Sequence, residues 1–273
     1  MLTLEQSQKI RELLQQADGL LITAGAGMGV DSGLPDFRGN EGMWKAYPAL
    51  GRQRVDFTQI ANPAAFRRYP RLAWGFYGHR LNLYRQTMPH RGFRILLELG
   101  KRFLHGSFVF TSNVDGHFQK AGFADTQVYE CHGSIHHMQC MQPCSYALWS
   151  AEEVLPVVDE ESCHYQDNLP ACPHCNGLAR PNILMFGDSS WLSLRSDGQE
   201  QRLAIWLKQV KRPLVIELGA GIAVPTVRLF SEGFAPNLIR INPRDTDIPR
   251  RGGLGLQMTS LDGLVAIQQV LNE

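Results

Sequence analysis

Short apolar runs recur along the chain, and the spaces between them are long enough for a helix. These runs predict buried strands, because a parallel strand is covered on both faces and loses the alternation of polar and apolar positions. They are residues 20–23, 108–110, 214–218 and 238–242. Helices are expected at residues 3–17, 93–99, 199–210 and 260–271, and Thr3 and Gln6 have the spacing of a capping box. Strands that alternate with helices predict an α/β fold with a parallel sheet.

The first apolar run leads into a glycine-rich stretch at residues 25–39. The stretch opens with Gly25-Ala26-Gly27 and closes with Pro35-Asp36-Phe37-Arg38-Gly39. Glycine lets the backbone approach a ligand closely, and exposed N–H groups suit a pyrophosphate. Pro35 discourages a helix, so a turn-rich loop is expected there. We interpret the stretch as a nucleotide-binding turn, with a glycine loop that binds nothing as the alternative.

Composition narrows the class of protein. The chain has 273 residues, of which 44% are hydrophobic and 19% charged, with a formal net charge of +1. This balance predicts an ordinary globular protein with no electrostatic footprint for nucleic acid or an anionic membrane. No apolar run is long enough to span a bilayer, and no secretory signal is visible, so we expect a cytoplasmic protein. Six cysteines in that setting favour metal binding or buried thiols over disulfides.

Four of the cysteines form two closely spaced pairs, Cys140 with Cys144 and Cys172 with Cys175. Four thiolates satisfy tetrahedral Zn²⁺ and leave no open position, which predicts a structural zinc site. The acidic segment between the pairs cannot form much core, and a metal would stabilise it. The spacing leaves other ligands open, because Cys163, His164 and His174 also lie in this region. Free cysteines are the remaining alternative.

Aromatic residues and arginines are interleaved at residues 40–85. This texture can indicate single-stranded nucleic acid, but a small helical module that covers a cofactor is the interpretation we prefer, because the stretch directly follows the glycine turn. Tyr77 and Arg80 are three residues apart and share a helix face, although Gly75 and Gly78 weaken the helix there. An aromatic core residue beside a surface arginine is the alternative for this pair.

These motifs together resemble the sirtuins, the NAD-dependent protein lysine deacylases. The glycine stretch matches the family signature at Gly25, Ala26, Gly27, Ser32, Gly33, Pro35, Asp36, Phe37 and Arg38. It departs at Gly29, where the family has serine, and at Leu34, where the family has isoleucine. Residues 111–122 match at Thr111, Asn113, Asp115, Ala121 and Gly122, while Ser112 replaces a glutamine and His117-Phe118 replaces Leu-His.

The resemblance implies roles for residues along the whole chain. His132, before Gly133 at the end of a predicted strand, corresponds to the general base, and a neutral imidazole suits that role. The other implied catalytic residues are Asn113 and Asp115. The implied NAD-binding residues are Gly25, Ala26, Gly27, Asp36, Phe37, Arg38, Ser112, Asn113, Asp115, Gly219, Ala220, Gly221 and Asn242. The implied zinc ligands are Cys140, Cys144, Cys172 and Cys175.

The resemblance also implies an acyl-lysine substrate. In one branch of the family, a pair like Tyr77 and Arg80 recognises acidic acyl groups such as succinyl. Residues 180–188 resemble the family segment that supplies a strand edge for the substrate peptide, which places Leu184, Phe186 and Gly187 at the substrate. An ordinary core strand is the alternative for this segment.

The fold that follows is a Rossmann-like sheet domain with a smaller inserted domain. Residues 1–39, 86–133 and 179–273 are assigned to the NAD-binding domain, and a helical module at 40–85 and a zinc module at 134–178 to the small domain. The expected reaction moves the acyl group of a lysine to ADP-ribose and releases nicotinamide. Mono-ADP-ribosyl transfer or NAD glycohydrolysis on the same scaffold, and an NAD-sensing protein with little turnover, remain as alternatives.

Overall fold

The computed structural model describes residues 2–35 and 39–272. Its main sheet has six parallel strands in the order β11-β10-β9-β1-β2-β3. These strands are β1 (Gly19–Ala24), β2 (Ser107–Thr111), β3 (Val128–Glu130), β9 (Pro213–Leu218), β10 (Leu238–Ile241) and β11 (Leu254–Leu256). All four predicted strands are present, and the predicted α/β class with a Rossmann-like parallel sheet is confirmed.

Helices cover both faces of this sheet, because successive side chains of each strand point to opposite faces. Leu20 and Ile22 pack with α1 (Leu4–Gln16), α8 (Arg91–Gly100) and α12 (Ser260–Asn272). Leu21 packs on the other face with α10 (Leu194–Gln209) and α11 (Thr226–Glu232). The capping box at Thr3 and Gln6 is present at the start of α1.

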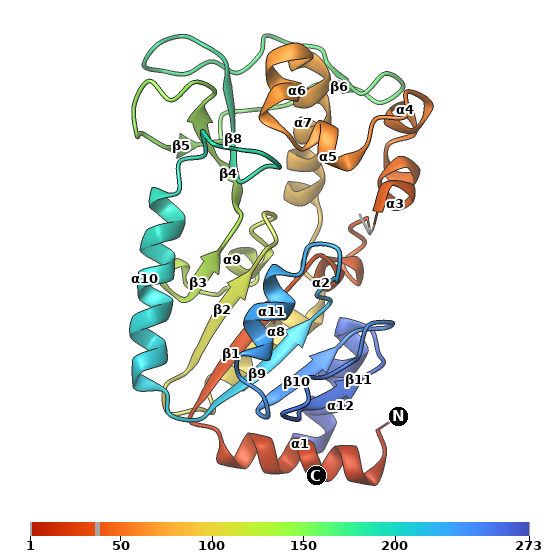
Figure 1. Cartoon of the computed structure of the whole chain (residues 1–273), viewed down its shortest axis with the longest axis vertical. Coiled ribbons are helices and arrows are strands. Elements are labelled where there is room, and N and C mark those ends of the chain that lie inside the picture. The colour runs from red at the N-terminus through yellow and green to blue at the C-terminus, as the bar shows by residue number, and fades with distance from the viewer. Residues whose placement is uncertain (1, 36–38, 273) are drawn as a thin grey trace.

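Two insertions form the other end of the molecule (Figure 1). The first is helical, with α3 (Gly39–Ala46), α4 (Pro48–Arg52), α5 (Phe57–Ile60), α6 (Pro63–Arg68) and α7 (Pro70–Gln86). The second carries β4 (Gly133–Cys140), β5 (Trp149–Ser150), β6 (Val158–Asp159) and β7 (His164–Tyr165). Strand β8 (Ala179–Ile183) pairs with β4 in a three-stranded sheet, so this part of the segment predicted to join the large domain pairs with the small one. The domain division as a whole stays a prediction.

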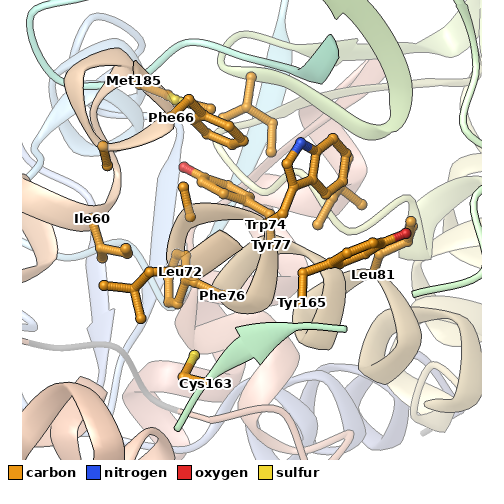
Figure 2. Packing of buried hydrophobic residues seen from close by; sticks show 14 of the residues in the cluster. Ile60, Phe66, Leu72, Trp74, Phe76, Tyr77, Leu81, Cys163, Tyr165 and Met185 are labelled. Atoms are coloured by element: carbon orange, nitrogen blue, oxygen red, sulfur yellow. The ribbon is translucent and has the colours of Figure 1, made fainter. Parts of the chain in front are cut away.

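The two insertions share one hydrophobic core built around α7. Figure 2 shows Phe66, Trp74, Tyr77 and Met185 packed together, with Cys163 and Tyr165 approaching the same helix. Gly75 makes this approach possible, because an added Cβ there would lie 1.9 Å from the carbonyl oxygen of Cys163. The glycines that weaken the helix propensity of α7 are therefore contact points for the hairpin formed by β6 and β7.

The short connecting elements are α2 (Gly27–Val30), α9 (His117–Lys120) and a 3-10 turn at Asp125–Gln127. Within residues 2–35 and 39–272, none of the helices combines the length and apolar character that a bilayer span requires.

Candidate active site and candidate metal centre

A cavity of about 460 Å³ lies at the carboxyl ends of the central strands, where the insertions meet the main sheet. Its volume is in the range of small-molecule and cofactor sites. The cavity brings together predicted residues from six separate stretches of the chain. Those that line it are Gly25, Ala26, Gly27, Tyr77, Arg80, Ser112, Asn113, Asp115, His132, Leu184, Phe186, Gly219, Ala220 and Gly221.

The loops after β1 and β9 contact each other through their backbones. The N–H of Gly27 donates to the carbonyl of Gly219 over 3.0 Å. Gly219 has a positive φ of 58°, and an added Cβ would lie 2.4 Å from the carbonyl carbon of Gly27. An added Cβ at Gly25 would lie 2.8 Å from the Cα of Ala220. Only glycine fits this double cradle, in which the N–H groups of Gly25, Gly27 and Gly219 are bonded to carbonyls and the bare backbone leaves room for a ligand to approach closely.

Asn113 and Asp115 are fixed by hydrogen bonds to neighbouring loops. The side-chain amide of Asn113 donates to the carbonyl of Gly25 over 3.0 Å, which ties it to the glycine turn. Asp115 is 7% exposed, and its carboxylate accepts the N–H of His117 over 2.9 Å. Its carbonyl accepts Nε2 of His136 over 2.8 Å. Both side chains are therefore held in place at the cavity before any ligand arrives.

His132 lies in the connection between β3 and β4. Its carbonyl accepts the N–H of Leu184 over 2.9 Å. Burial lowers the pKa of the imidazole below its ordinary value, although a hydrogen bond with the backbone of Ser112 opposes part of that shift. The ring is thus neutral near pH 7 and able to accept a proton.

Tyr77 and Arg80 both face the cavity from α7. Arg80 donates from Nε and Nη2 to the hydroxyl of Tyr84, over 2.9 and 2.5 Å, and its guanidinium lies against the ring of Phe76. Burial raises the pKa of Tyr77 to about 12, so its hydroxyl stays protonated and can donate. Tyr84 was not predicted as a site residue, although its i+4 spacing from Arg80 on one helix was a usable signal.

The segment after β8 presents an exposed edge at the cavity. Leu184 and Phe186 are 38% and 37% exposed, and the N–H of Phe186 donates to the carbonyl of Ala61 over 2.9 Å. A buried ion pair joins the two ends of this region, with 2.8 Å between Nη2 of Arg180 in β8 and Oδ2 of Asp188. An exposed segment that directly continues a strand is suited to contact with a substrate peptide.

Among the described residues, two of those predicted to bind NAD or substrate do not line the cavity. Gly187 has a positive φ of 63° and makes the turn that follows Phe186. Asn242 is fully buried, and its amide donates to the carbonyl of Ala220 while its oxygen accepts the N–H groups of Arg244 and Asp245. Its side chain is therefore used to hold the loop after β9 in place. The predicted NAD-binding residues Asp36, Phe37 and Arg38 lie outside the described residues.

The predicted zinc ligands form a second cluster away from the cavity. The sulfur atoms of Cys140, Cys144, Cys172 and Cys175 all lie within 4.8 Å of one another, and two of the pairs are 3.7 Å apart. Zn–S bonds of about 2.3 Å in a tetrahedron place sulfur atoms about 3.8 Å apart, whereas a disulfide needs about 2 Å. The four thiols therefore fit a structural zinc ion.

The other candidate zinc ligands do not join this cluster within the described part of the chain. Cys163 is buried against α7, where burial raises the pKa of its thiol to about 12. Nδ1 of His164 lies 2.9 Å from the carbonyl of Ser162, and the side chain of His174 is exposed.

The fold, the glycine-lined cavity and the four-cysteine cluster define a Rossmann-like α/β protein with a small inserted domain. A model of the Sir2 family matches residues 25–204, so the chain belongs to the Sir2 family, the sirtuins.

Relatives and solved structures agree with this membership. The chain is 29% identical over 259 residues to the NAD-dependent protein deacylase 1 of Caldanaerobacter subterraneus, covering 93% of this chain and 94% of that one. It is 27% identical to the NAD-dependent protein deacylase of Aquifex aeolicus, covering 93% and 95%. A Sir2 homologue solved as an NAD complex superposes with a TM-score of 0.72 at 23% identity, covering 97% of this chain and 94% of that one.

Proposed function

We propose that the protein is an NAD-dependent deacylase that acts on acylated lysine side chains of proteins or peptides. One observation carries the proposal: a single cavity joins a glycine cradle, two anchored polar side chains, a half-buried neutral imidazole and an exposed segment of chain. Family membership and the relatives, which are NAD-dependent protein deacylases, support the same activity.

The residues divide the work by their chemistry. The double glycine cradle would let the pyrophosphate of NAD approach the backbone of the loops after β1 and β9 closely. Asp115, with Ala26, would hold the nicotinamide carboxamide, and Asn113 would fix the adjoining pocket. NAD, when bound, supplies the ribose that receives the acyl group and releases nicotinamide. The roles of Asp36, Phe37 and Arg38 remain predictions of the family resemblance.

His132 would act as the general base. Its lowered pKa keeps the ring unprotonated, and it would accept a proton from a ribose hydroxyl. The substrate peptide would lie along residues 184–186 by strand addition, which directs its acyl-lysine into the cavity. No nucleophilic side chain of the enzyme is required. The four-cysteine cluster would hold a zinc ion that stabilises the small domain and takes no part in the reaction.

The acyl end of the cavity favours an acidic acyl group. Arg80 is 8% exposed and carries a permanent charge, and the protonated hydroxyl of Tyr77 faces the same cavity. A carboxylate at the end of a succinyl or malonyl group would receive charge-assisted hydrogen bonds from this pair. The bonds of Arg80 to the hydroxyl of Tyr84 hold the guanidinium at the cavity.

Nicotinamide release from NAD tests the proposal, measured with acetyl- and succinyl-lysine peptides and with the unmodified peptide. Deacylation requires release that depends on the acyl group, together with an O-acyl-ADP-ribose product by mass spectrometry. His132→Ala should lower turnover by about a hundredfold or more while ADP-ribose still binds. Release without an acylated peptide would instead favour NAD glycohydrolysis or ADP-ribosyl transfer, and NAD binding without release would favour a sensor.

A further inference from the structure

Strand β3 is an edge strand of the main sheet, and it ends two residues before His132. In a parallel strand, the N–H and C=O groups of alternate residues point to opposite sides. The N–H of Cys131 donates inward to the carbonyl of Thr111 on β2. The backbone groups of Glu130 therefore point outward, to the side where the sheet has no further strand.

Side chains of α10 form the hydrogen bonds to Glu130 that a neighbouring strand would otherwise form. The N–H of Glu130 donates to Oε1 of Gln199 over 3.1 Å, and its carbonyl accepts the hydroxyl of Ser196 over 3.0 Å. The carboxylate of Glu130 is 1% exposed and lies 2.5 Å from Nη2 of Arg195. Nε2 of Gln199 donates to the same carboxylate oxygen over 3.4 Å. Three residues from the first turns of α10 thus hold the backbone and the side chain of one residue.

The same stretch of chain holds His132 directly. His132 follows Glu130 in the turn after β3, and its carbonyl accepts the N–H of Leu184. The residues that bond to Glu130 and to the carbonyl of His132 all lie within residues 184–199, namely Leu184, Arg195, Ser196 and Gln199. Asn182 joins this stretch to β4, because its amide donates to the carbonyl of Leu192 and to Oε1 of Gln139, each over 2.9 Å. The backbone on either side of Cys131 is therefore held by residues 184–199, while the imidazole itself bonds the backbone of Ser112.

We propose that Glu130 is a positioning residue for His132, acting through its bonds to Arg195, Ser196 and Gln199. This inference rests on the proposed function, in which His132 is the general base. Glu130 does not line the cavity, so its effect is on where the imidazole lies and on how fully it is buried. A displacement of about 1 Å at a reacting group can cost about a hundredfold in rate.

Glu130→Gln keeps the shape of the side chain and removes the charge that Arg195 holds. Glu200→Gln is the matched control, because Glu200 is exposed on the same helix. We expect Glu130→Gln to lower kcat about tenfold, with the KM for the peptide and the affinity for ADP-ribose within about twofold of wild type. Arg195→Met should match that loss, and Arg195→Lys should recover most of the rate. Ser196→Ala removes one bond only and gives a smaller loss, which keeps a measurable variant if Glu130→Gln does not fold.

The titration of His132 itself separates positioning from general stability. Burial lowers the pKa of this imidazole, so loosening its anchor should raise the pKa toward about 6.5. The acid limb of kcat/KM and the NMR titration of the His132 ring should both move to higher pH in Glu130→Gln and stay in place in Glu200→Gln. An unchanged titration, or equal losses in the two variants, would overturn the inference. If His132→Ala keeps its turnover, the proposed function fails instead, and the NMR titration still reports whether Glu130 holds the ring.

Discussion

Gly75→Ala should destabilise the protein, although alanine is the better helix former. Gly75 lies inside α7, and replacing a glycine in a helix by alanine gains about 1 kcal/mol in the absence of other contacts. The added Cβ, however, would lie 1.9 Å from the carbonyl oxygen of Cys163, 2.6 Å from its carbonyl carbon and 3.1 Å from the Cα of His164. All three atoms are backbone, so no side chain can rotate away to make room.

The hairpin that carries Cys163 cannot move away cheaply. Arg71 donates to the carbonyl of Tyr165 over 2.8 Å, and Asn82 donates to the carbonyl of Pro156 over 2.8 Å. These bonds attach the hairpin to α7 on both sides of Gly75. Overpacking a close contact costs about 1–3 kcal/mol, and a contact between two backbones belongs at the upper end of that range. The clash therefore outweighs the helix term, with a net loss of about 1–2 kcal/mol.

Scanning calorimetry of the zinc-loaded protein measures this difference. For a chain of this size, about 1 kcal/mol shifts Tm by roughly 2–4 °C, so Gly75→Ala should lower Tm by about 2–8 °C. Gly198→Ala in α10 is the matched control, because its Cβ would meet only the guanidinium of Arg202 at 3.8 Å. That variant should raise Tm by about 1–4 °C. A Gly75→Ala protein as stable as wild type would show that the hairpin does not press on α7.

Three further predictions concern the zinc, the acyl group and pH. Cys172→Ser should release zinc and lower Tm, whereas Cys163→Ser should keep about one zinc per chain by elemental analysis; equal zinc in both variants would contradict the site. Arg80→Met should slow succinyl-lysine turnover about tenfold to a hundredfold more than acetyl-lysine turnover, since a charge-assisted bond contributes about 1.5–3 kcal/mol; equal slowing would make Arg80 structural. The kcat/KM should fall at acid pH as His132 gains a proton, with a midpoint below about 6.5 because burial lowers its pKa, and a midpoint above that value would assign the limb to another group.

The sequence predicted the main sheet well, because its signal is local. Every residue of β1 is buried, which is why an apolar run sufficed to find it. The start of α10 was placed five residues too late, since its first turns carry Ser196, Asp197 and Gly198 in place of an apolar stripe. Helices α3 to α6 have only four to eight residues each, and their order comes from packing against α7, which no periodicity in so short a stretch reveals.

The parts of the site that the sequence missed depend on contacts between distant residues. Nothing near Gly75 indicates that Cys163 lies against it, and nothing near Glu130 indicates Arg195 as its partner. A charged residue at the end of an apolar strand was the one available signal for Glu130, because an acid in that position needs a partner when it is buried. For Asn242 the sequence identified the right position but not the role of the side chain. Its amide donates to the carbonyl of Ala220 and so holds the loop after β9.

The departures from the sirtuin pattern bear on the choice between deacylation and the alternative NAD chemistries. The departures at Gly29 and Leu34 are structurally coupled. A Cβ at position 29 would lie 2.9 Å from Cδ1 of Leu34, so the leucine side chain occupies the space that a serine side chain would need. Phe118 packs in the core against Phe93 and does not line the cavity. Ser112 does line the cavity, so it alone of Gly29, Ser112 and Phe118 remains as an argument for ADP-ribosyl transfer or glycohydrolysis. With the cradle, Asn113, Asp115 and His132 all in place around it, one shorter side chain enlarges the pocket without removing a reacting group, and this favours deacylation.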